Sequence, residues 1–116
     1  MSIIRTTKRI RDALLETGVD LYHYNASKPT AAYAVWAEDG ETTAGYGDNG
    51  KTEQTISGTV DYYTREEFDP MTDRIQEALN RLNGYGCTWS LDQVLFEEET
   101  NWIRFTWSWE VSGCLA

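Results

Sequence analysis

The sequence has few of the residues that build most catalytic and metal-binding sites. Its 116 residues include one histidine, two prolines and two cysteines, Cys87 and Cys114. The cysteines do not form a CxxC pair, and with His23 alone they cannot complete a zinc ligand set. We therefore expect two reduced thiols, as in a cytoplasmic protein, with no bound metal ion and no cofactor.

Basic residues are also scarce. Ten Lys and Arg face nineteen Asp and Glu, which gives a net charge of −9. Binding of nucleic acid through a basic face is therefore not expected. The charge is uneven, because residues 1–37 carry five basic and three acidic groups whereas residues 38–69 carry two basic and nine acidic groups. These two segments could meet on neighbouring copies of the chain, or the acidity could serve only solubility.

Long hydrophobic runs are missing as well. No apolar stretch approaches the ~18 residues that a membrane span needs, so we expect no membrane insertion. The first residues, MSIIRTTKRIRDALLE, lack the apolar centre of a signal peptide and are expected to stay on the protein as a helix. With 41% hydrophobic residues and 25% charged residues, the composition predicts one folded domain over residues 1–116.

Apolar residues at helical spacing predict two helices. The first runs for three to four turns and ends at Gly18; its inward stripe is Ile3, Ile10 and Leu14. The second begins at Asp69-Pro70, a capping side chain followed by proline at the first helical position, and ends at Gly84. Its inward stripe is Met71, Ile75, Ala78, Leu79 and Leu82.

Alternating apolar and polar residues predict five strands, at 19–24, 33–37, 54–64, 88–97 and 102–111. The last strand has the clearest alternation, with Ile103, Phe105, Trp107, Trp109 and Val111 pointing one way. Residues 98–101 form the turn before it. The order α-β-β-β-α-β-β predicts an α+β fold, a mostly antiparallel sheet with both helices packed on one face.

The segment 38–53 is irregular. It holds four glycines and the turn dipeptides Asp39-Gly40 and Asn49-Gly50, with few apolar residues to bury. We therefore expect a long loop or a protruding hairpin. Such segments in compact domains commonly carry function.

Three features could suggest chemistry, and each has a simpler interpretation. The run Glu97 to Glu99 could attract a cation, but consecutive strand residues diverge, which favours a solvated turn. Asp48-Asn49-Gly50 resembles part of a calcium loop without its later ligands. His23 has no nucleophile motif beside it, so a structural role is favoured. Nothing in the spacing of Asp61 and Asp69 favours a glycosidase-like carboxylate pair. We therefore expect no enzyme activity.

Two aromatic residues lie on polar faces of their strands, Trp102 on the last strand and Tyr63 on the third. Exposed aromatic residues of this kind suggest a contact surface for another protein. The alternative is that a second layer covers them.

The chain resembles the tail terminator, or tail-completion, proteins of long-tailed phages and prophages of Gram-positive hosts, some of which are described as minor capsid proteins. The resemblance covers most of the chain. The stretches that carry it are VDLYHYNA (19–26), YAVWAE (33–38), GDNGKTEQTISGTVDYYT (47–64), FDPMTDRIQEAL (68–79) and WSLDQVLFEEETNWIRFTWSWEV (89–111).

The resemblance implies a ring of copies, a hexamer, that caps the tail tube, stops its polymerisation and docks to the head connector in the virion. DNA would pass through this ring without specific binding, and an acidic lining would repel its phosphates. The segment 38–53 would contact a neighbour or the tube. Our candidate protein-interface residues are Asp39, Glu41, Tyr46, Asp48, Lys51, Glu53 and Trp102. The alternatives are another phage neck protein, for head completion or as a stopper, and a small enzyme or ligand-binding module.

Overall fold

The computed structural model describes residues 2–27, 29–47 and 50–114. The elements in chain order are α1 (Ile3–Leu15), β1 (Leu21–His23), β2 (Tyr33–Gly47), β3 (Gly50–Thr64), α2 (Met71–Arg81), the 3-10 helix η1 (Leu82–Tyr85), β4 (Cys87–Glu97) and β5 (Trp102–Cys114). This order confirms the predicted α+β class and the predicted sequence of helices and strands.

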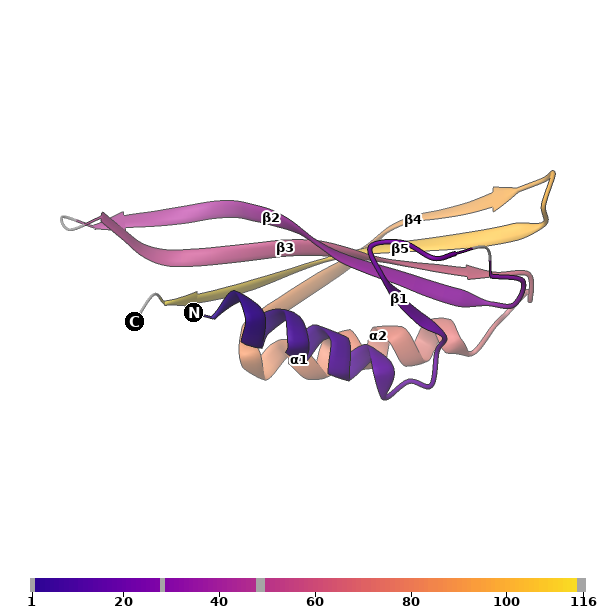
Figure 1. Ribbon diagram of the computed structural model, residues 1–116, viewed down its shortest axis with the longest axis horizontal. Helices are drawn as coiled ribbons and strands as arrows, with labels where there is room; N and C mark the ends of the chain where they lie inside the picture. The colour runs from indigo at the N-terminus through magenta and orange to yellow at the C-terminus, as the bar shows by residue number, and fades with distance from the viewer. Residues whose placement is uncertain (1, 28, 48–49, 115–116) are drawn as a thin grey trace.

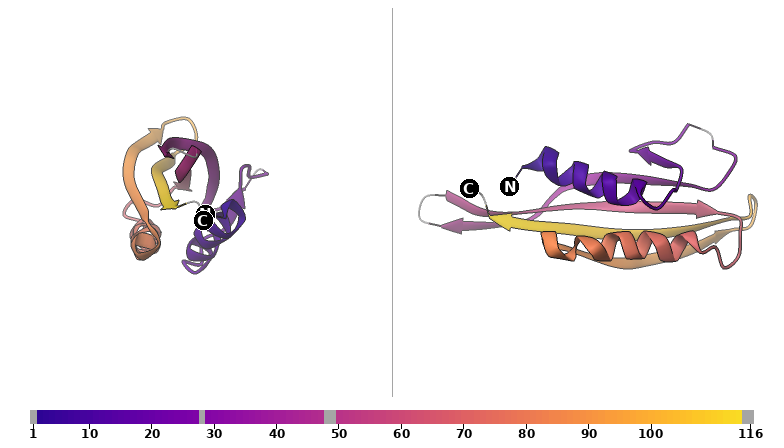
Figure 2. Two further views of the ribbon diagram at one scale, coloured as in Figure 1. Left: turned by 90° about the vertical axis from the view of Figure 1, so that its left-hand side faces the viewer. Right: turned by 90° about the horizontal axis from the view of Figure 1, so that it is seen from below.

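The strands form one sheet in the order β1-β2-β3-β5-β4. Every pairing is antiparallel except that of the short edge strand β1, which runs parallel to β2. Both helices cover the same face of the sheet and run in opposite directions (Figures 1 and 2). The sheet is therefore mostly antiparallel, as predicted, with one parallel edge.

The core lies between this helical layer and the sheet. The predicted inward faces of α2 and β5 are confirmed; their most buried members are Ile75, Leu79, Trp107 and Trp109. The prediction for α1 was wrong at one position, because Ile3 is 50% exposed. The buried residues of α1 are Thr6, Ile10 and Leu14. Seven residues turn a helix by about 700°, close to two full turns, so Ile3 lies on the same side of α1 as Ile10. Its exposure follows from its place at the end of the helix, ahead of Thr6, the first buried residue.

The strand β2 is much longer than the five residues predicted at 33–37. It continues to Gly47 and pairs with β3 along its whole length, as in the pairs Glu41 with Ile56 and Gly45 with Glu53. The segment 38–53 is thus largely the outer part of a β-hairpin. Its polar, glycine-rich residues lack the alternation that predicts a half-buried strand, and the strand pairing with β3 supports the conformation of the segment.

The second helix differs from its prediction at both ends. Its first helical residue is Met71, but the carboxylate of Asp69 still accepts a hydrogen bond from the Met71 amide, at 2.9 Å. The helical path ends at Gly86 and not at Gly84. Gly86 has a φ of 80°, in the left-handed region that favours glycine, and η1 bridges the interval between α2 and this stop.

Cys87 is a free thiol at the start of β4, and it is buried. Burial raises the pKa of this thiol to about 11, so the group stays protonated and unreactive near neutral pH. Cys114 is placed by its backbone at the end of β5. Within the described part of the chain, no helix has the length and apolar character needed to cross a membrane.

Candidate functional site

The β2–β3 hairpin is the most prominent projection of the molecule. The molecule measures 54 × 25 × 23 Å, and the outer half of the hairpin runs past the N-terminal end of α1 at one end of the long axis (Figure 1). Register shifts interrupt the pairing after Glu38, Glu41 and Gly45. Such irregularities bend and twist a strand pair, so the hairpin is a curved arm.

The predicted interface residues of this arm are distributed along both strands. Asp39 and Glu41 on β2 and Glu53 on β3 have exposed side chains. Tyr46 and Lys51 are backbone partners across the hairpin, and Asp48 lies outside the described residues. The arm therefore presents carboxylates on a segment that has little apolar surface of its own.

Trp102 belongs to a different part of the molecule. It is the first residue of β5, whereas Glu53 pairs with Cys114 at the other end of that strand. Twelve residues of extended strand separate these two positions, or about 40 Å. The seven predicted residues therefore do not form one site.

The side chain of Trp102 is held in an aromatic cluster on the sheet face opposite the helices. Its ring meets Tyr33 edge-on, with centroids 5.7 Å apart, and Tyr33 stacks on Tyr63 at 4.6 Å. The guanidinium of Arg65 lies 3.8 Å above the Trp102 ring, a cation–π contact. Trp102 and Tyr63 are consequently half-buried against their neighbours rather than fully exposed.

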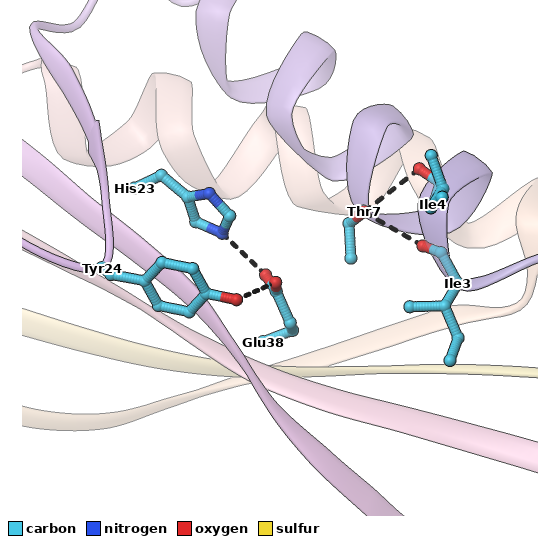
Figure 3. A network of polar contacts seen from close by, with 6 residues as sticks. All are labelled: Ile3, Ile4, Thr7, His23, Tyr24 and Glu38. Carbon is cyan, nitrogen blue, oxygen red and sulfur yellow. Dashed lines mark hydrogen bonds and ion pairs between the residues drawn. The ribbon is translucent and has the colours of Figure 1, made fainter.

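A third feature joins β1 to β2 through side chains (Figure 3). Nε2 of His23 lies 2.8 Å from Oε2 of Glu38, and the hydroxyl of Tyr24 donates to the other carboxylate oxygen. The imidazole is stacked between Tyr24 and Trp36, with centroid separations of 3.9 and 4.0 Å. The same figure shows Thr7 of α1, whose hydroxyl donates to the carbonyls of its own helix.

The electrostatics of this cluster favour an ionised Glu38. Burial alone would raise the pKa of Glu38, but the hydrogen bonds from Tyr24 and His23 outweigh it and lower the pKa. The pKa of Tyr24 is raised, first by its hydrogen bond to Glu38. A carboxylate and an imidazole in contact could act as a general base. Within the described residues, however, the only hydrogen bond of the ring is to Glu38, and two aromatic rings cover its faces. The cluster therefore fits a structural link between β1 and β2.

This link predicts a pH effect for the variant Glu38→Gln. The pKa of Glu38 is lowered in the folded state. The ionised side chain therefore contributes its full stabilisation of the fold above the unfolded-state pKa, and this contribution disappears as the pH falls through the folded-state pKa. The difference in unfolding free energy between wild type and variant should therefore shrink on acidification below about pH 4.5. Urea unfolding from pH 7 to pH 3 measures it. A difference that stays constant over this range contradicts an ionised role.

Metal binding has no support in the arrangement of acidic side chains. In the part of the chain that the structure describes, no three His, Cys, Asp or Glu side chains are grouped to hold an ion. Glu97 accepts a hydrogen bond from the hydroxyl of Thr100 at 3.1 Å within the β4–β5 turn. This contact fits the interpretation of residues 97–99 as part of a solvated turn.

Sequence reasoning missed two features of the surface. Phe68, in the β3–α2 loop, is 91% exposed and has a φ of 60°. The edge strand β4 also exposes apolar side chains, namely Leu91, Val94, Leu95 and Phe96. The available signal for Phe68 was an aromatic residue within the acidic run Glu66-Glu67-Phe68-Asp69. Periodicity placed the β4 residues on a strand but could not show that one edge stays unpaired.

Comparison with known proteins adds no relative: neither a protein-family model nor a curated protein matches the chain. Its function therefore has to be argued from its own residues. The strongest of these observations is the projecting hairpin with its exposed carboxylates.

Proposed function

We propose that the protein is a structural component of a phage tail. Copies of the chain form a ring, six by the resemblance, that caps the tail tube, ends its polymerisation and joins it to the head connector. The observation that carries this proposal is the β2–β3 hairpin, which extends beyond the helical layer instead of folding onto its own core (Figure 1).

The composition of the hairpin supports a role in assembly. Asp39, Glu41 and Glu53 are exposed on a segment that contains few apolar residues. β5 pairs with β3 as far as Glu53, so the hairpin is two-stranded only beyond Gly45 and Glu53. A two-stranded ribbon is stable only marginally without further packing, so a neighbouring copy or the tail tube is the natural support for this end. Carboxylates that face the lumen of a ring would repel DNA phosphates and let DNA pass.

Deletion of residues 41–50 tests the role of the hairpin in assembly. We expect the deletion to abolish the ring and to leave the monomer folded, because the deletion keeps the core residues described on β2 and β3, namely Ala34, Trp36, Ile56, Val60 and Tyr62. Native mass spectrometry and light scattering measure the oligomer, and circular dichroism checks the fold. The triple variant Asp39→Asn, Glu41→Gln, Glu53→Gln is the milder control, since it keeps the hairpin and removes only charge. A deletion variant that still forms hexamers contradicts the proposal.

The capping activity can be tested with purified tail tube protein. Wild-type protein should stop tube growth when added during polymerisation, so that electron micrographs show short tubes with a ring at one end. The deletion variant is the matched control and should leave tube length unchanged. Free growth of tubes in the presence of wild-type protein would refute a terminator role, even if the protein forms a ring.

A further inference from the structure

Phe68 is an exposed aromatic residue in a strained conformation. Its side chain is 91% exposed and its φ is 60°, in the left-handed region. A bulky residue there is an outlier, and such strain persists mainly where the surrounding structure enforces it. Neither feature helps the fold of the single chain, so Phe68 is a candidate for a contact with another molecule.

The loop that carries Phe68 is fixed on both sides. On one side the Asp69 carboxylate accepts hydrogen bonds from the hydroxyls of Tyr62 and Thr64, at 2.5 and 2.7 Å. On the other side the guanidinium of Arg65 donates to the carbonyls of Thr30 and Thr100, at 3.2 and 3.1 Å. Because these contacts fix the loop before any partner arrives, Phe68 is presented in a preorganised position, which reduces the entropy lost on binding.

The helical layer contains a groove of about 720 Å³ between α1 and α2. Figure 2 shows the two helices lying apart on the same face of the sheet. Apolar side chains contribute to the lining of this groove, namely Ile4, Ala13, Ala78, Leu82 and Tyr85. An aromatic ring is a suitable occupant for an apolar lining of this kind.

The rims of the same groove are basic in a chain that is acidic overall. Four basic residues line it against two acidic ones; the basic residues are Arg5, Lys8, Arg9 and Arg81. Arg9 is placed by a cation–π contact with Tyr85, at 3.9 Å. Within the described residues, Arg5 and Lys8 have no acidic partner. The groove thus combines an apolar lining with unpaired positive charge.

We propose that the segment Glu66-Glu67-Phe68 of one copy docks into the α1–α2 groove of a second copy. Phe68 enters the apolar lining, and the two exposed carboxylates pair with Arg5 and Lys8 on the rim. This contact would form the interface between neighbouring copies in the proposed ring. The proposal rests on the proposed function for the closure of that ring.

The contact joins two copies because Phe68 cannot fill the groove of its own chain. It precedes Met71, the first residue of α2, whereas the groove involves the last turn of that helix at Arg81. Ten helical residues, or about 15 Å, separate these two ends. The two surfaces therefore lie apart on each copy, and repeating the contact gives a head-to-tail assembly, which is a ring when the rotation between copies closes and an open filament when it does not.

Charge reversal tests the pairing. Variant one, Glu66→Lys with Glu67→Lys, and variant two, Arg5→Glu with Lys8→Glu, should each lose association. Variant two is compatible with folding, since an acidic residue is favourable at Arg5, in the first turn of α1, and the side chain of Lys8 is exposed. A mixture of the two restores opposite charges at every contact and should recover the wild-type oligomer in native mass spectrometry. Failure of the mixture to associate, or undiminished association of either variant alone, overturns the proposal.

Substitution of Phe68 separates binding from folding. Phe68→Asn should weaken association by about 10- to 100-fold while the melting temperature is kept or raised, because Asn tolerates a positive φ better than Phe. On the groove side, Ile4→Ser should weaken association and Ile3→Ser should not, since Ile3 is also exposed but does not line the groove. Equal effects of the two isoleucine substitutions overturn the proposal.

Photocrosslinking of the full chain distinguishes this contact from the ring itself. With p-benzoylphenylalanine at position 68, crosslinks should map by mass spectrometry to residues 2–16 or 78–85 of a second copy. Crosslinks to the hairpin 39–54 of the second copy, or none at concentrations where the protein associates, overturn the contact while the ring can still stand. Groove crosslinks in a protein that never caps tail tubes support the contact and refute the proposed function.

Discussion

Replacement of Gly58 by alanine is expected to destabilise the protein by about 3 kcal/mol, at the upper end of overpacking effects. A Cβ at this position would lie 2.1 Å from Cζ2 of Trp109 and 2.2 Å from the carbonyl oxygen of Ala37. The Trp109 ring is fully buried, and the Ala37 backbone belongs to the β2–β3 ladder. Neither atom can move without disturbing the core or the sheet.

Urea unfolding followed by tryptophan fluorescence measures this effect as a fall in the unfolding midpoint. The matched control is Gly84→Ala in η1, where an added Cβ meets no atom within 4 Å. That substitution should be neutral or stabilise the protein by about 0.4–1 kcal/mol, because it restricts the unfolded chain. Equal midpoints for the two variants would show that the sheet can accommodate a side chain at Gly58.

Periodicity predicted the fold wherever one face of an element is buried. Trp107 and Trp109 alternate with polar residues because β5 lies between the helical layer and solvent, and Ile75 and Leu79 mark the inward side of α2 for the same reason. The outer half of β2 has only Ala44 and Tyr46 as apolar residues, so no period identifies it as a strand. Its partner β3 determines its conformation, and pairing with a distant strand leaves no local signal.

The candidate sites were less predictable, because they depend on contacts between distant residues. His23 was identified from its residue type, but its partner Glu38 is fifteen positions away and is brought to it by the parallel β1–β2 pairing. Trp102 was expected as an exposed aromatic residue, yet Arg65 and Tyr33 hold its ring. The strain at Phe68 is a backbone property that composition does not encode.

The distribution of charge connects these features to assembly. Basic residues outnumber acidic ones in the lining of the groove between the helices, whereas the hairpin exposes the carboxylates of Asp39, Glu41 and Glu53 and the loop before α2 exposes those of Glu66 and Glu67. The loop combines its two carboxylates with Phe68, whose side chain is 91% exposed, on a backbone that Asp69 and Arg65 fix. This combination is why we assign the groove to the loop and leave the carboxylates of the hairpin for the lumen or the tube.

Removal of the Asp69 carboxylate should have the second large effect on stability. In Asp69→Ala the hydroxyls of Tyr62 and Thr64 lose their acceptor and the Met71 amide loses its cap. Stranded donors and a lost helix cap together predict a loss of about 3 kcal/mol at pH 7. Tyr62→Phe removes one donor and leaves the carboxylate bonded to Thr64 and Met71, so it should destabilise the protein by only about 1 kcal/mol.

The pH dependence identifies the ionised carboxylate as the cause. Burial opposes ionisation of Asp69, but the hydrogen bonds from Tyr62, the Met71 amide and Thr64 outweigh it, so the pKa is lowered. The stabilisation is therefore complete above the unfolded-state pKa, near 4, and is lost as the pH falls through the lower folded pKa. The difference in unfolding free energy between wild type and Asp69→Ala should therefore narrow between pH 4 and pH 2.

The double variant Asp69→Ala, Tyr62→Phe tests whether the two residues act through their shared hydrogen bond. Burial and Asp69 raise the pKa of Tyr62, so the two groups are coupled. The loss of unfolding free energy in the double variant should be smaller than the sum of the losses in the two single variants. Strict additivity, or a gap that does not narrow in acid, would show that the carboxylate acts only through its shape.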